Sequence, residues 1–234
     1  MQSFPSGART KLYYPVGIAV SSTGKIYVAN GGSGIGPDGN GYVTVYAAGS
    51  NGDVAPAAVI GGSNTGLDQP VGIALDSSGK LFVANNETQP PCCGSVTIYP
   101  AGSNGNVTPS VTIAGGNTGL YFPSGIALDA SGNIYVTNDW GDLDGIGFIT
   151  VYPARSKGNA APSATITAVS DPCSIALDSA GDIYVASYYP QACNSHCGNI
   201  VIYPAGSNGD ATPSAVIGGS STGLAGPQGI VISP

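Results

Sequence analysis

Acidic and amide side chains are concentrated in two glycine-rich stretches of the sequence. Asp139, Asp142 and Asp144 lie in NDWGDLDGIG, and Asp38 and Asn40 lie in GPDGNG. Carboxylate and amide oxygens at such close spacing are the ligands of calcium, which takes six to eight of them. Neither stretch matches the full EF-hand pattern. Calcium is the one cofactor that these residues suggest, with Asp139, Asp142 and Asp144 as candidate ligands, and otherwise no cofactor is expected.

The second chemical feature is a set of five cysteines, which are Cys92, Cys93, Cys173, Cys193 and Cys197. A structural zinc site needs four ligands at recognisable spacing, and the single histidine, His196, lies between two cysteines that are four residues apart, which is a poor match. We therefore predict a disulfide between Cys193 and Cys197, which would close a small loop. An odd number leaves at least one thiol free or bonded to another chain, and Cys173 is also interpretable as a small buried residue.

Amide side chains recur at one position, directly after an apolar stretch; these residues are Asn30, Asn85 and Asn138, and Ser187 takes the fourth position. The amides are expected either to contact a ligand or to cap the loop backbone that follows. Aromatic side chains lie in the same or neighbouring loops, namely Tyr121, Trp140, Tyr188 and Tyr189. Together with the three asparagines, these aromatic residues are the candidate ligand contacts.

The elements that must position these residues are four copies of one phrase. PVGIALDSSGKLFVAN begins at Pro70, related stretches begin at Pro15, Pro123 and Pro172, and a fragment, PQGIVISP, begins at Pro227. The prolines are 49 to 55 residues apart. Self-similarity at such a period indicates an array of supersecondary units that bury their apolar faces against one another. The chain is therefore a repeat protein.

Each repeat is predicted to hold two β-hairpins. GIAL and KLFVAN are short aliphatic and aromatic stretches separated by DSSG, and the same pattern recurs with DASG and DSAG. We interpret Asp76, Asp129 and Asp178 as turn residues, because their carboxylates accept backbone hydrogen bonds while the glycine supplies a positive φ. A second pair of strands follows around turns such as AGSNGN. Each repeat thus has four strands, a to d in chain order.

Four-stranded units that are linked from strand d to strand a are typical of β-propellers, in which strand a lines the axis. We therefore predict an all-β propeller of four-stranded blades that forms one domain over 1–234. The blades are expected at 15–69, 70–122, 123–171 and 172–226, with a remnant strand at 1–14 and a lone strand at 227–234. Ile73 and Leu75 are expected to face a neighbouring blade, and small residues are expected on the other side of strand a.

The pattern P-x-GIAxD-xxGxxYVA(D/N) also resembles that of NHL-repeat proteins, and the resemblance covers all four units. It implies the propeller fold and little about activity. Among enzymes of similar fold, peptidyl-amidating lyases use several histidines, and lactonase-type propellers hold calcium with acidic and amide groups. This chain has one histidine, and Glu87 is its sole glutamate. We therefore expect no catalysis; the alternative is a calcium-dependent hydrolase or lyase.

The repeats differ mainly in the connection from strand b to strand c. It reads GGSGIGPDGNG in the first repeat, NETQPPCCG in the second, DWGDLDGIG in the third and YYPQACNSHCG in the fourth, whereas the c-to-d turns are nearly identical. In a propeller the b-to-c and d-to-a connections lie on one face, and variable loops on a rigid scaffold are where binding usually resides. We expect a protein or glycan ligand on this loop face, and a binding or scaffold role.

Charged residues make up only 8% of the chain, and its net charge is -7. A nucleic acid would be repelled, so no such partner is expected. The polar surface must therefore consist mainly of serine, threonine, asparagine and glycine, a composition that suits a secreted or cell-surface protein. The first residues lack the apolar core of a signal peptide, so we expect that an export signal was removed. No apolar stretch approaches the roughly 20 residues that a membrane-spanning helix needs.

The extra strands predicted before and after the four blades suggest an incomplete array. Strand edges and an exposed apolar strand such as GIVI invite pairing with another chain. We therefore expect either a longer parent protein or the assembly of several copies into a homo-oligomer or a filament.

Overall fold

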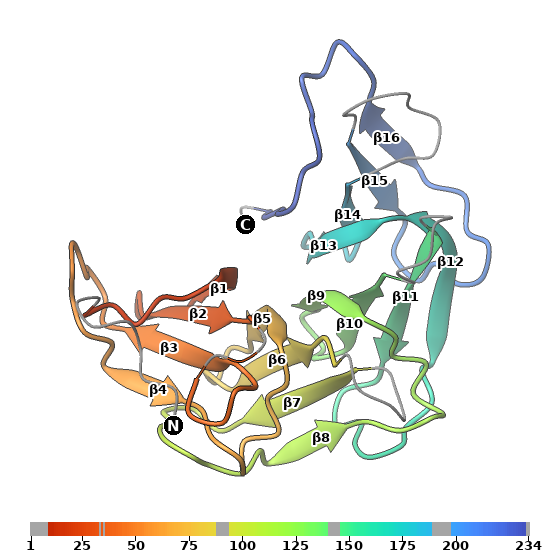
Figure 1. Ribbon diagram of the computed structural model, residues 1–234. Coiled ribbons are helices and arrows are strands. Elements are labelled where there is room, and N and C mark those ends of the chain that lie inside the picture. Colours follow the sequence, from red (N-terminus) through yellow and green to blue (C-terminus); the bar gives the residue numbers. More distant parts are fainter. Residues whose placement is uncertain are drawn as a thin grey trace. The chain divides into compact units, whose positions relative to one another are not determined.

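The computed structural model describes residues 9–32, 34, 36–87, 94–139, 146–188 and 198–232. Within these residues the chain forms 16 β-strands (Figure 1) and no helix, and so none that is long and apolar enough to cross a membrane. The strands form four antiparallel sheets of four strands each. The predicted fold class, an all-β propeller of four-stranded blades, is confirmed.

Each repeat forms one sheet, and each sheet is one blade in which consecutive strands pair. Blade 1 contains β1 (Pro15–Val20), β2 (Ile26–Asn30), β3 (Tyr42–Tyr46) and β4 (Ala58–Ile60). Blade 2 contains β5 (Pro70–Leu75), β6 (Leu81–Asn85), β7 (Ser95–Tyr99) and β8 (Val111–Ile113). Blade 3 contains β9 (Pro123–Leu128), β10 (Ile134–Asn138), β11 (Ile146–Tyr152) and β12 (Ala164–Ser170). Blade 4 contains β13 (Pro172–Leu177), β14 (Ile183–Ser187), β15 (Asn199–Tyr203) and β16 (Ala215–Gly218).

The chain consists of two compact units, Met1–Ala114 and Gly115–Pro234. The first unit holds blades 1 and 2, and the second unit holds blades 3 and 4. The prediction that all four blades form a single domain stays a prediction.

The turn between strands a and b is built around an aspartate in three of the blades. Asp76 Oδ1 accepts hydrogen bonds from the backbone N–H groups two and four positions later, both at 2.9 Å. Asp129 and Asp178 accept the corresponding pairs of bonds in blades 3 and 4. The interpretation of these aspartates as turn residues is therefore confirmed.

The core of the first unit lies between its two blades. Its buried members are Tyr27, Val43, Val45, Ile60, Leu67, Ile73, Leu81, Val83 and Tyr99. Ile73 projects from β5 into this cluster, and the half-buried Leu75 packs against it. Both residues of strand a thus face the neighbouring blade, as the sequence predicted.

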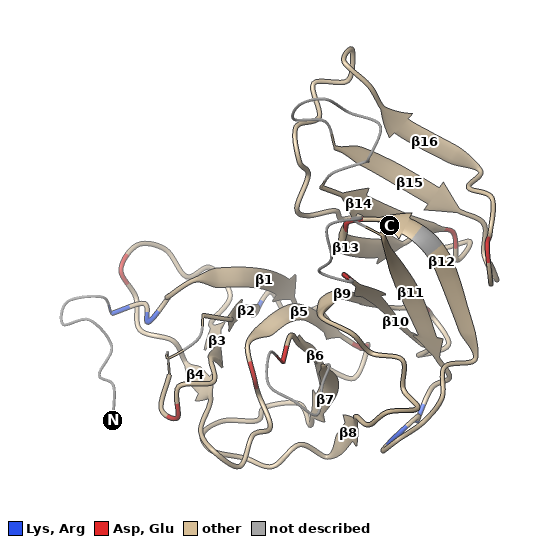
Figure 2. Cartoon of the chain, turned by 45° about the vertical axis from the view of Figure 1, so that its right-hand side comes forward, with Lys and Arg blue, Asp and Glu red and all other residues tan. Residues whose placement is uncertain are grey.

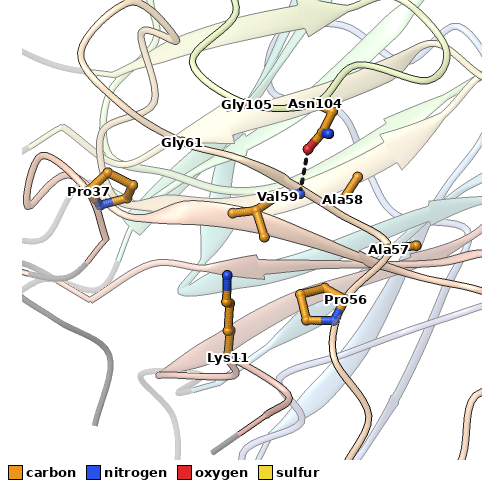
Figure 3. Close-up of a pocket in the computed structure, with 9 residues that line it drawn as sticks. All are labelled: Lys11, Pro37, Pro56, Ala57, Ala58, Val59, Gly61, Asn104 and Gly105. Atoms are coloured by element: carbon orange, nitrogen blue, oxygen red, sulfur yellow. Dashed lines mark hydrogen bonds between the residues drawn. The ribbon is translucent and has the colours of Figure 1, made fainter. Parts of the chain in front are cut away.

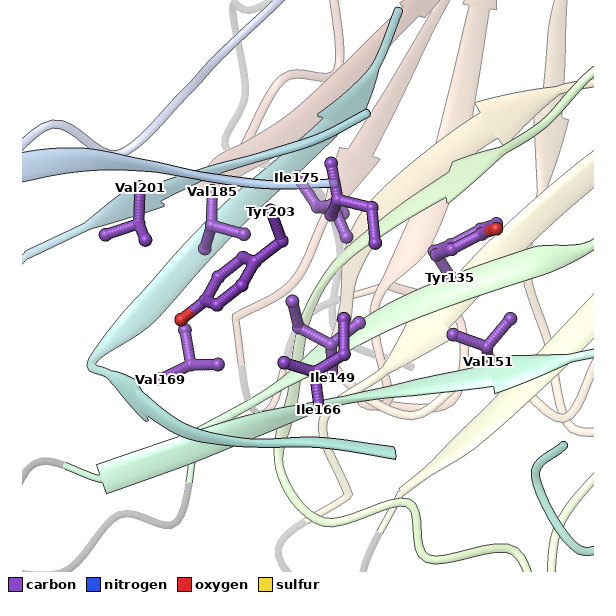
Figure 4. Close-up of a cluster of buried hydrophobic side chains, with 10 residues drawn as sticks. Tyr135, Ile149, Val151, Ile166, Val169, Ile175, Val185, Val201 and Tyr203 are labelled. Atoms are coloured by element: carbon purple, nitrogen blue, oxygen red, sulfur yellow. The ribbon is translucent and has the colours of Figure 1, made fainter. Parts of the chain in front are cut away.

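The core of the second unit has the same construction (Figure 4). Its buried members are Tyr135, Ile149, Val151, Ile166, Val169, Ile175, Ile183, Val185, Val201 and Tyr203. Because each blade is only one sheet thick, the side chains of this cluster are covered by the neighbouring blade and not by a second layer of their own blade.

The first strands of neighbouring blades approach closely enough to require small residues. A Cβ atom at Gly17 of β1 would overlap the carbonyl oxygen of Val71 in β5. In the second unit, a Cβ atom at Gly125 of β9 would lie 3.0 Å from Cα of Ser174 in β13. Small residues on this side of strand a were predicted from the sequence, and backbone-to-backbone contact is the physical reason.

The segments before β1 and after β16 contain no strand among the described residues, which are 9–14 and 227–232. The remnant strand predicted within 1–14 reaches into residues outside the described ones and stays a prediction, whereas the lone strand predicted at 227–234 is not formed over 227–232. A strand persists only where a neighbouring strand takes up its backbone hydrogen bonds. Residues 9–14 instead pack on blade 1 as a link, since the Tyr42 hydroxyl donates to Lys11 O at 2.9 Å and the Tyr46 hydroxyl donates to Thr10 O.

Candidate functional site

The asparagine that ends the second strand of a blade is a capping residue. In blade 1, Asn30 Oδ1 accepts a hydrogen bond from Tyr13 N at 2.9 Å. Its Nδ2 donates to Val28 O at 3.1 Å and to Thr44 Oγ1 at 3.2 Å. The side chain is 0% exposed. One amide thereby joins the incoming link, its own strand and the third strand.

Blades 2 and 3 repeat these bonds. Asn85 accepts from Asp68 N at 3.2 Å, and its Nδ2 donates to the hydroxyl of Thr97 at 3.1 Å. Asn138 accepts from the backbone N–H of the corresponding link residue at 2.9 Å and donates to the corresponding threonine at 3.1 Å. Both are 0% exposed. Capping, one of the two interpretations left open by the sequence, accounts for these bonds. A ligand would have to displace them, and contact of Asn30, Asn85 or Asn138 with a ligand stays a prediction.

Blade 4 departs from this pattern at both ends of the bond. Ser187 stands where the other blades have asparagine, and Val201 stands where they have threonine. Ser187 Oγ and Asn199 Oδ1, on paired residues of β14 and β15, are buried with no hydrogen-bond partner among the described residues. Among the described residues, the end of β14 in blade 4 is thus the one place where buried polar side-chain atoms have no hydrogen-bond partner.

Three carboxyl groups of the first unit lie near one another although they come from three separate connections. Burial raises the pKa of Asp68 above its ordinary value, and the negative charges of Glu87 and Asp38 raise it further. Glu87 Oε1 also accepts a hydrogen bond from Ser95 Oγ at 2.8 Å. Charged residues are few along the chain (Figure 2), so this acidic group is a distinct local feature. Within the described residues, however, no three His, Cys, Asp or Glu side chains are grouped closely enough to hold a metal ion.

Aromatic rings, exposed in the first unit and half-buried in the second, lie beside the strand a prolines. Tyr13 and Tyr14 form an edge-to-face pair with ring centroids 4.9 Å apart, and Tyr14 is 67% exposed. In the second unit, Tyr121 pairs with Phe122 in the same way at 4.8 Å. Tyr188, which directly follows β14, is 39% exposed. The structure thus places Tyr121 and Tyr188, two predicted ligand contacts, on the connections that were expected to form the loop face.

The residue before the strand a proline has a left-handed backbone in every repeat. The φ values are 48° at Tyr14, 48° at Gln69, 44° at Phe122 and 32° at Asp171. Residues other than glycine rarely adopt this conformation, and it persists only where the surroundings hold it. The link therefore turns sharply directly before strand a, which the sequence did not reveal.

Cys173 in β13 is a free thiol within a mostly buried environment. Burial raises its pKa to about 11, and the negative charges of Asp139 and Asp171 contribute. A nucleophilic cysteine needs the opposite shift, toward a thiolate at neutral pH. Its environment is therefore that of a structural residue, which agrees with one of the two interpretations left open by the sequence.

The remaining predicted site residues lie outside the described residues. They are Trp140, Asp142, Asp144, Tyr189, Cys193 and Cys197. The calcium site in NDWGDLDGIG and the disulfide between Cys193 and Cys197 accordingly stay predictions. Asp139, the first of the three candidate metal ligands, is described and lies near Cys173.

A shallow pocket of about 420 Å³ lies at the outer strand of blade 1 (Figure 3). Pro37, Pro56 and Val59 line it, and Lys11 is the one charged residue among its lining residues. Asn104 of the blade 2 turn closes one side by accepting a hydrogen bond from Val59 N at 3.0 Å. Most of its polar backbone is engaged in joining two blades, so the pocket offers little chemistry to a ligand.

Comparisons with known proteins address the fold alone. No protein-family model and no curated protein matches the chain. A crystal structure of a protein of unknown function from Bacteroides caccae is similar, with a TM-score of 0.56 and 14% sequence identity over 87% of this chain. The chain spans 60% of the length of that protein. The similarity supports the arrangement of strands and gives no activity.

Proposed function

We propose that this protein is a non-catalytic binding or scaffold module of NHL-like repeats, secreted or displayed at the cell surface, whose loop face contacts a protein or glycan. The proposal rests on a difference, within each blade, between the residues that hold the fold together and the residues that vary between repeats. The amides and the turn aspartates, each present in three of the four repeats, are engaged in hydrogen bonds within the fold itself. What differs between repeats lies on the connections at one end of each blade, beside exposed tyrosines.

The chemistry of these connections suits a neutral partner. Tyr14 and Tyr188 present exposed rings, and aromatic side chains with a polar tip are favoured where one surface must contact both apolar and polar groups. Few cationic side chains are available for an anionic partner, since the chain has only 6 Lys and Arg. Sugar rings and uncharged protein surfaces fit this face best.

A calcium-dependent hydrolase or lyase is the second candidate, and one observation favours it. Burial raises the pKa of Asp68, and the negative charges of Glu87 and Asp38 raise it further; a divalent cation bound nearby would offset those charges, although the described carboxylates are not grouped closely enough to hold it by themselves. The ion would have to draw further oxygen ligands from the backbone and water, because calcium takes six to eight. Its chemical contribution would be to polarise a substrate oxygen.

Affinity gel electrophoresis tests the first proposal. The probes are soluble polysaccharides cast in the gel, namely xyloglucan, mixed-linkage β-glucan, mannan and pectin, each run against a gel without polysaccharide. We expect at least one of them to retard the protein and Tyr188→Ala to abolish the retardation. Lys157→Ala removes an exposed side chain from a c-to-d turn and should behave as the parent. Equal migration of the parent in all gels would refute a glycan ligand of these classes.

Thermal unfolding in about 5 mM calcium and in EDTA separates the second candidate from the first. A ligand that binds only the folded state must raise Tm by mass action. Equal Tm values in the two conditions would eliminate the calcium-dependent enzyme. A shift that is lost in Asp68→Asn would locate the ion at the acidic group, and one that is lost in Asp142→Asn would locate it in NDWGDLDGIG.

A further inference from the structure

Blade 1 carries an exposed apolar face on its first strand. Val16, Ile18 and Val20 alternate along one side of β1 and are 59%, 67% and 60% exposed. We call these three residues the inserting face. Isolated exposed apolar residues are ordinary, but a row of three β-branched side chains on one strand indicates a contact surface.

Blade 4 carries a second apolar face. Tyr184, Ile200 and Ile202 are half-buried, and Ile217 of β16 is 51% exposed. We call these four residues the receiving face. They alternate with inward-facing residues of the unit 2 core such as Val185 and Val201, so they lie on the opposite side of the sheet.

The interface inside the first unit shows what such faces do. Ile73 of β5 lies in one buried cluster with Val43, Val45 and Ile60 of blade 1, and it is 8% exposed. Ile60, on the accepting side, is 1% exposed. In the second unit, Ile175 inserts against Ile149 and Ile166 in the same way.

The strand register shows that the inserting face and the receiving face correspond to the two sides of the contact between blades 1 and 2. Ile18 pairs with Val28 as Ile73 pairs with Val83, so Ile18 is the inserting residue of blade 1. Ile217 pairs with Ile200 as Ile60 pairs with Val43, so Ile217 is an accepting residue of blade 4. The chain therefore presents both halves of a contact that it already makes within each unit.

The link after β16 already has the form of a link between two blades. Thr222 Oγ1 donates to Gly219 O at 2.8 Å and accepts from Leu224 N at 3.2 Å. Thr65, between blades 1 and 2, makes the same pair of bonds at 2.7 and 3.3 Å. Thr65 is 0% exposed, whereas Thr222 is exposed. This link is formed but exposed, and a blade that carries its own link would have to displace it.

The start of a following blade also has a prepared position. Pro227 lies against Gly198 as Pro172 lies against Gly147, so Gly198 accepts the proline with which a strand a begins. The position of the preceding link on blade 1 is filled by the chain's own residues, because Tyr46 donates to Thr10 O as Tyr99 donates to Thr65 O. A blade 1 that approaches blade 4 thus brings its own link with it.

We propose that the receiving face of one copy binds the inserting face of a second copy, head to tail. Ile18 and Val20 of the second copy pack against Ile200 and Ile217 of the first, and Pro15 of the second copy replaces Pro227 at Gly198. A second copy is the occupant because it carries, by construction, the side chains that complete each face. The contact is heterologous, so it continues from copy to copy unless it closes into a ring.

Sedimentation velocity over a range of concentrations tests the proposal on the full chain. Ile18→Asp and Ile217→Asp each place a charge in the contact, and we expect each to weaken association by about a hundredfold or more. Ala130→Asp adds the same charge in an exposed a-to-b turn of blade 3 and should associate as the parent does. Circular dichroism spectra and melting curves check that the variants fold.

Mixing the two variants gives the decisive result. Ile18→Asp retains an intact receiving face and Ile217→Asp retains an intact inserting face, so an equimolar mixture should form a one-to-one dimer and nothing larger. A parent that is monomeric at high concentration would overturn the proposal. This holds whichever segment then covers the two faces. A mixture that stays monomeric, or variants that associate as the parent does, would overturn it equally.

Discussion

Substitution of Asn138 by alanine separates capping from ligand binding. The alanine removes the acceptor of Tyr121 N, which the amide oxygen holds at 2.9 Å. It also removes the donor to Val136 O at 3.0 Å and to Thr150 Oγ1 at 3.1 Å. If the asparagine is a cap, the variant loses stability whether or not any ligand is present.

The magnitude follows from what each atom loses. A buried donor left without a partner costs about 1–3 kcal/mol, and an ordinary hydrogen bond contributes about 0.5–1.5 kcal/mol net. The N–H of Tyr121 is partly buried and approaches the first kind, while the hydroxyl of Thr150 can rotate toward another acceptor. We therefore expect the free energy of unfolding to fall by about 2–4 kcal/mol, a large part of the stability of an ordinary domain.

Urea unfolding measures this loss as a lower midpoint at an unchanged slope. Amide hydrogen exchange should show faster exchange at Tyr121. In the double-mutant cycle, Thr150→Val should cost about 0.5–1.5 kcal/mol less in the Asn138→Ala background than in the parent. Asn51→Ala, in an exposed c-to-d turn, is the control and should change stability by less than about 0.5 kcal/mol. A loss of under 0.5 kcal/mol in Asn138→Ala would refute the capping assignment.

Three further predictions concern packing and ionisation. Gly17→Ala should lower the free energy of unfolding by about 1–3 kcal/mol, because its Cβ overlaps the neighbouring strand; Gly116→Ala, which meets no atom within 4 Å, should not. The raised pKa of Asp68 means that its ionised form costs stability above that pKa and that protonation removes the cost. Asp68→Asn should therefore raise Tm at pH 7, and the gain should shrink as the pH falls through the raised pKa; an equal gain at every pH would contradict this. With a pKa of about 11, Cys173 is protonated at pH 8, so native parent and Cys173→Ser should react with a disulfide reagent at the same initial rate and differ by one thiol only after unfolding.

The repeated phrase was enough to predict the sheets because every strand and turn is specified locally. Ile73 and Leu75 alternate with small residues, and Asp76 supplies the turn that fixes the register of the hairpin. A shift by one residue would move the apolar side chains to the wrong face, so pattern and turn must agree. They agree in all four repeats.

The cap was harder to assign because its partners are distant in sequence. Asn85 accepts from a residue 17 positions earlier and donates to a threonine 12 positions later. One indication was nevertheless present within the single sequence. The threonine of strand c accompanies the asparagine of strand b in three repeats, and both are replaced in the fourth, by Val201 and Ser187. Residues that change together between repeats are candidates for direct contact.

The acidic group could not be predicted, because it exists only when two blades are stacked. Asp38 and Glu87 lie on the b-to-c connections of different blades, and Asp68 lies on the link between them. The hydrogen bond from Gln69 N to Asn40 O, at 2.8 Å, joins that link to the first connection. Packing of separate elements sets such distances, and sequence spacing carries no information about them.

The short link before blade 4 explains why this blade has no capping asparagine. In the earlier repeats the link from strand d to strand a is long, as between Ile113 and Pro123, and its backbone N–H needs the amide oxygen as acceptor. Between blades 3 and 4 the link is a single residue, because β12 continues to Ser170 and pairs its backbone with β11. The sheet itself thus satisfies groups that the asparagine satisfies elsewhere.

The loss of the long link therefore removes the need for the asparagine, and Ser187 is sufficient to fill its place. The smaller side chain leaves its own Oγ and the neighbouring Asn199 Oδ1 without partners among the described residues. Unsatisfied buried polar atoms are costly, and they persist where water or a ligand takes them up. They lie at the end of β14, next to the exposed Tyr188. If a partner on the loop face also contacts the frame of the protein, the top of blade 4 is where hydrogen-bonding groups remain to receive it.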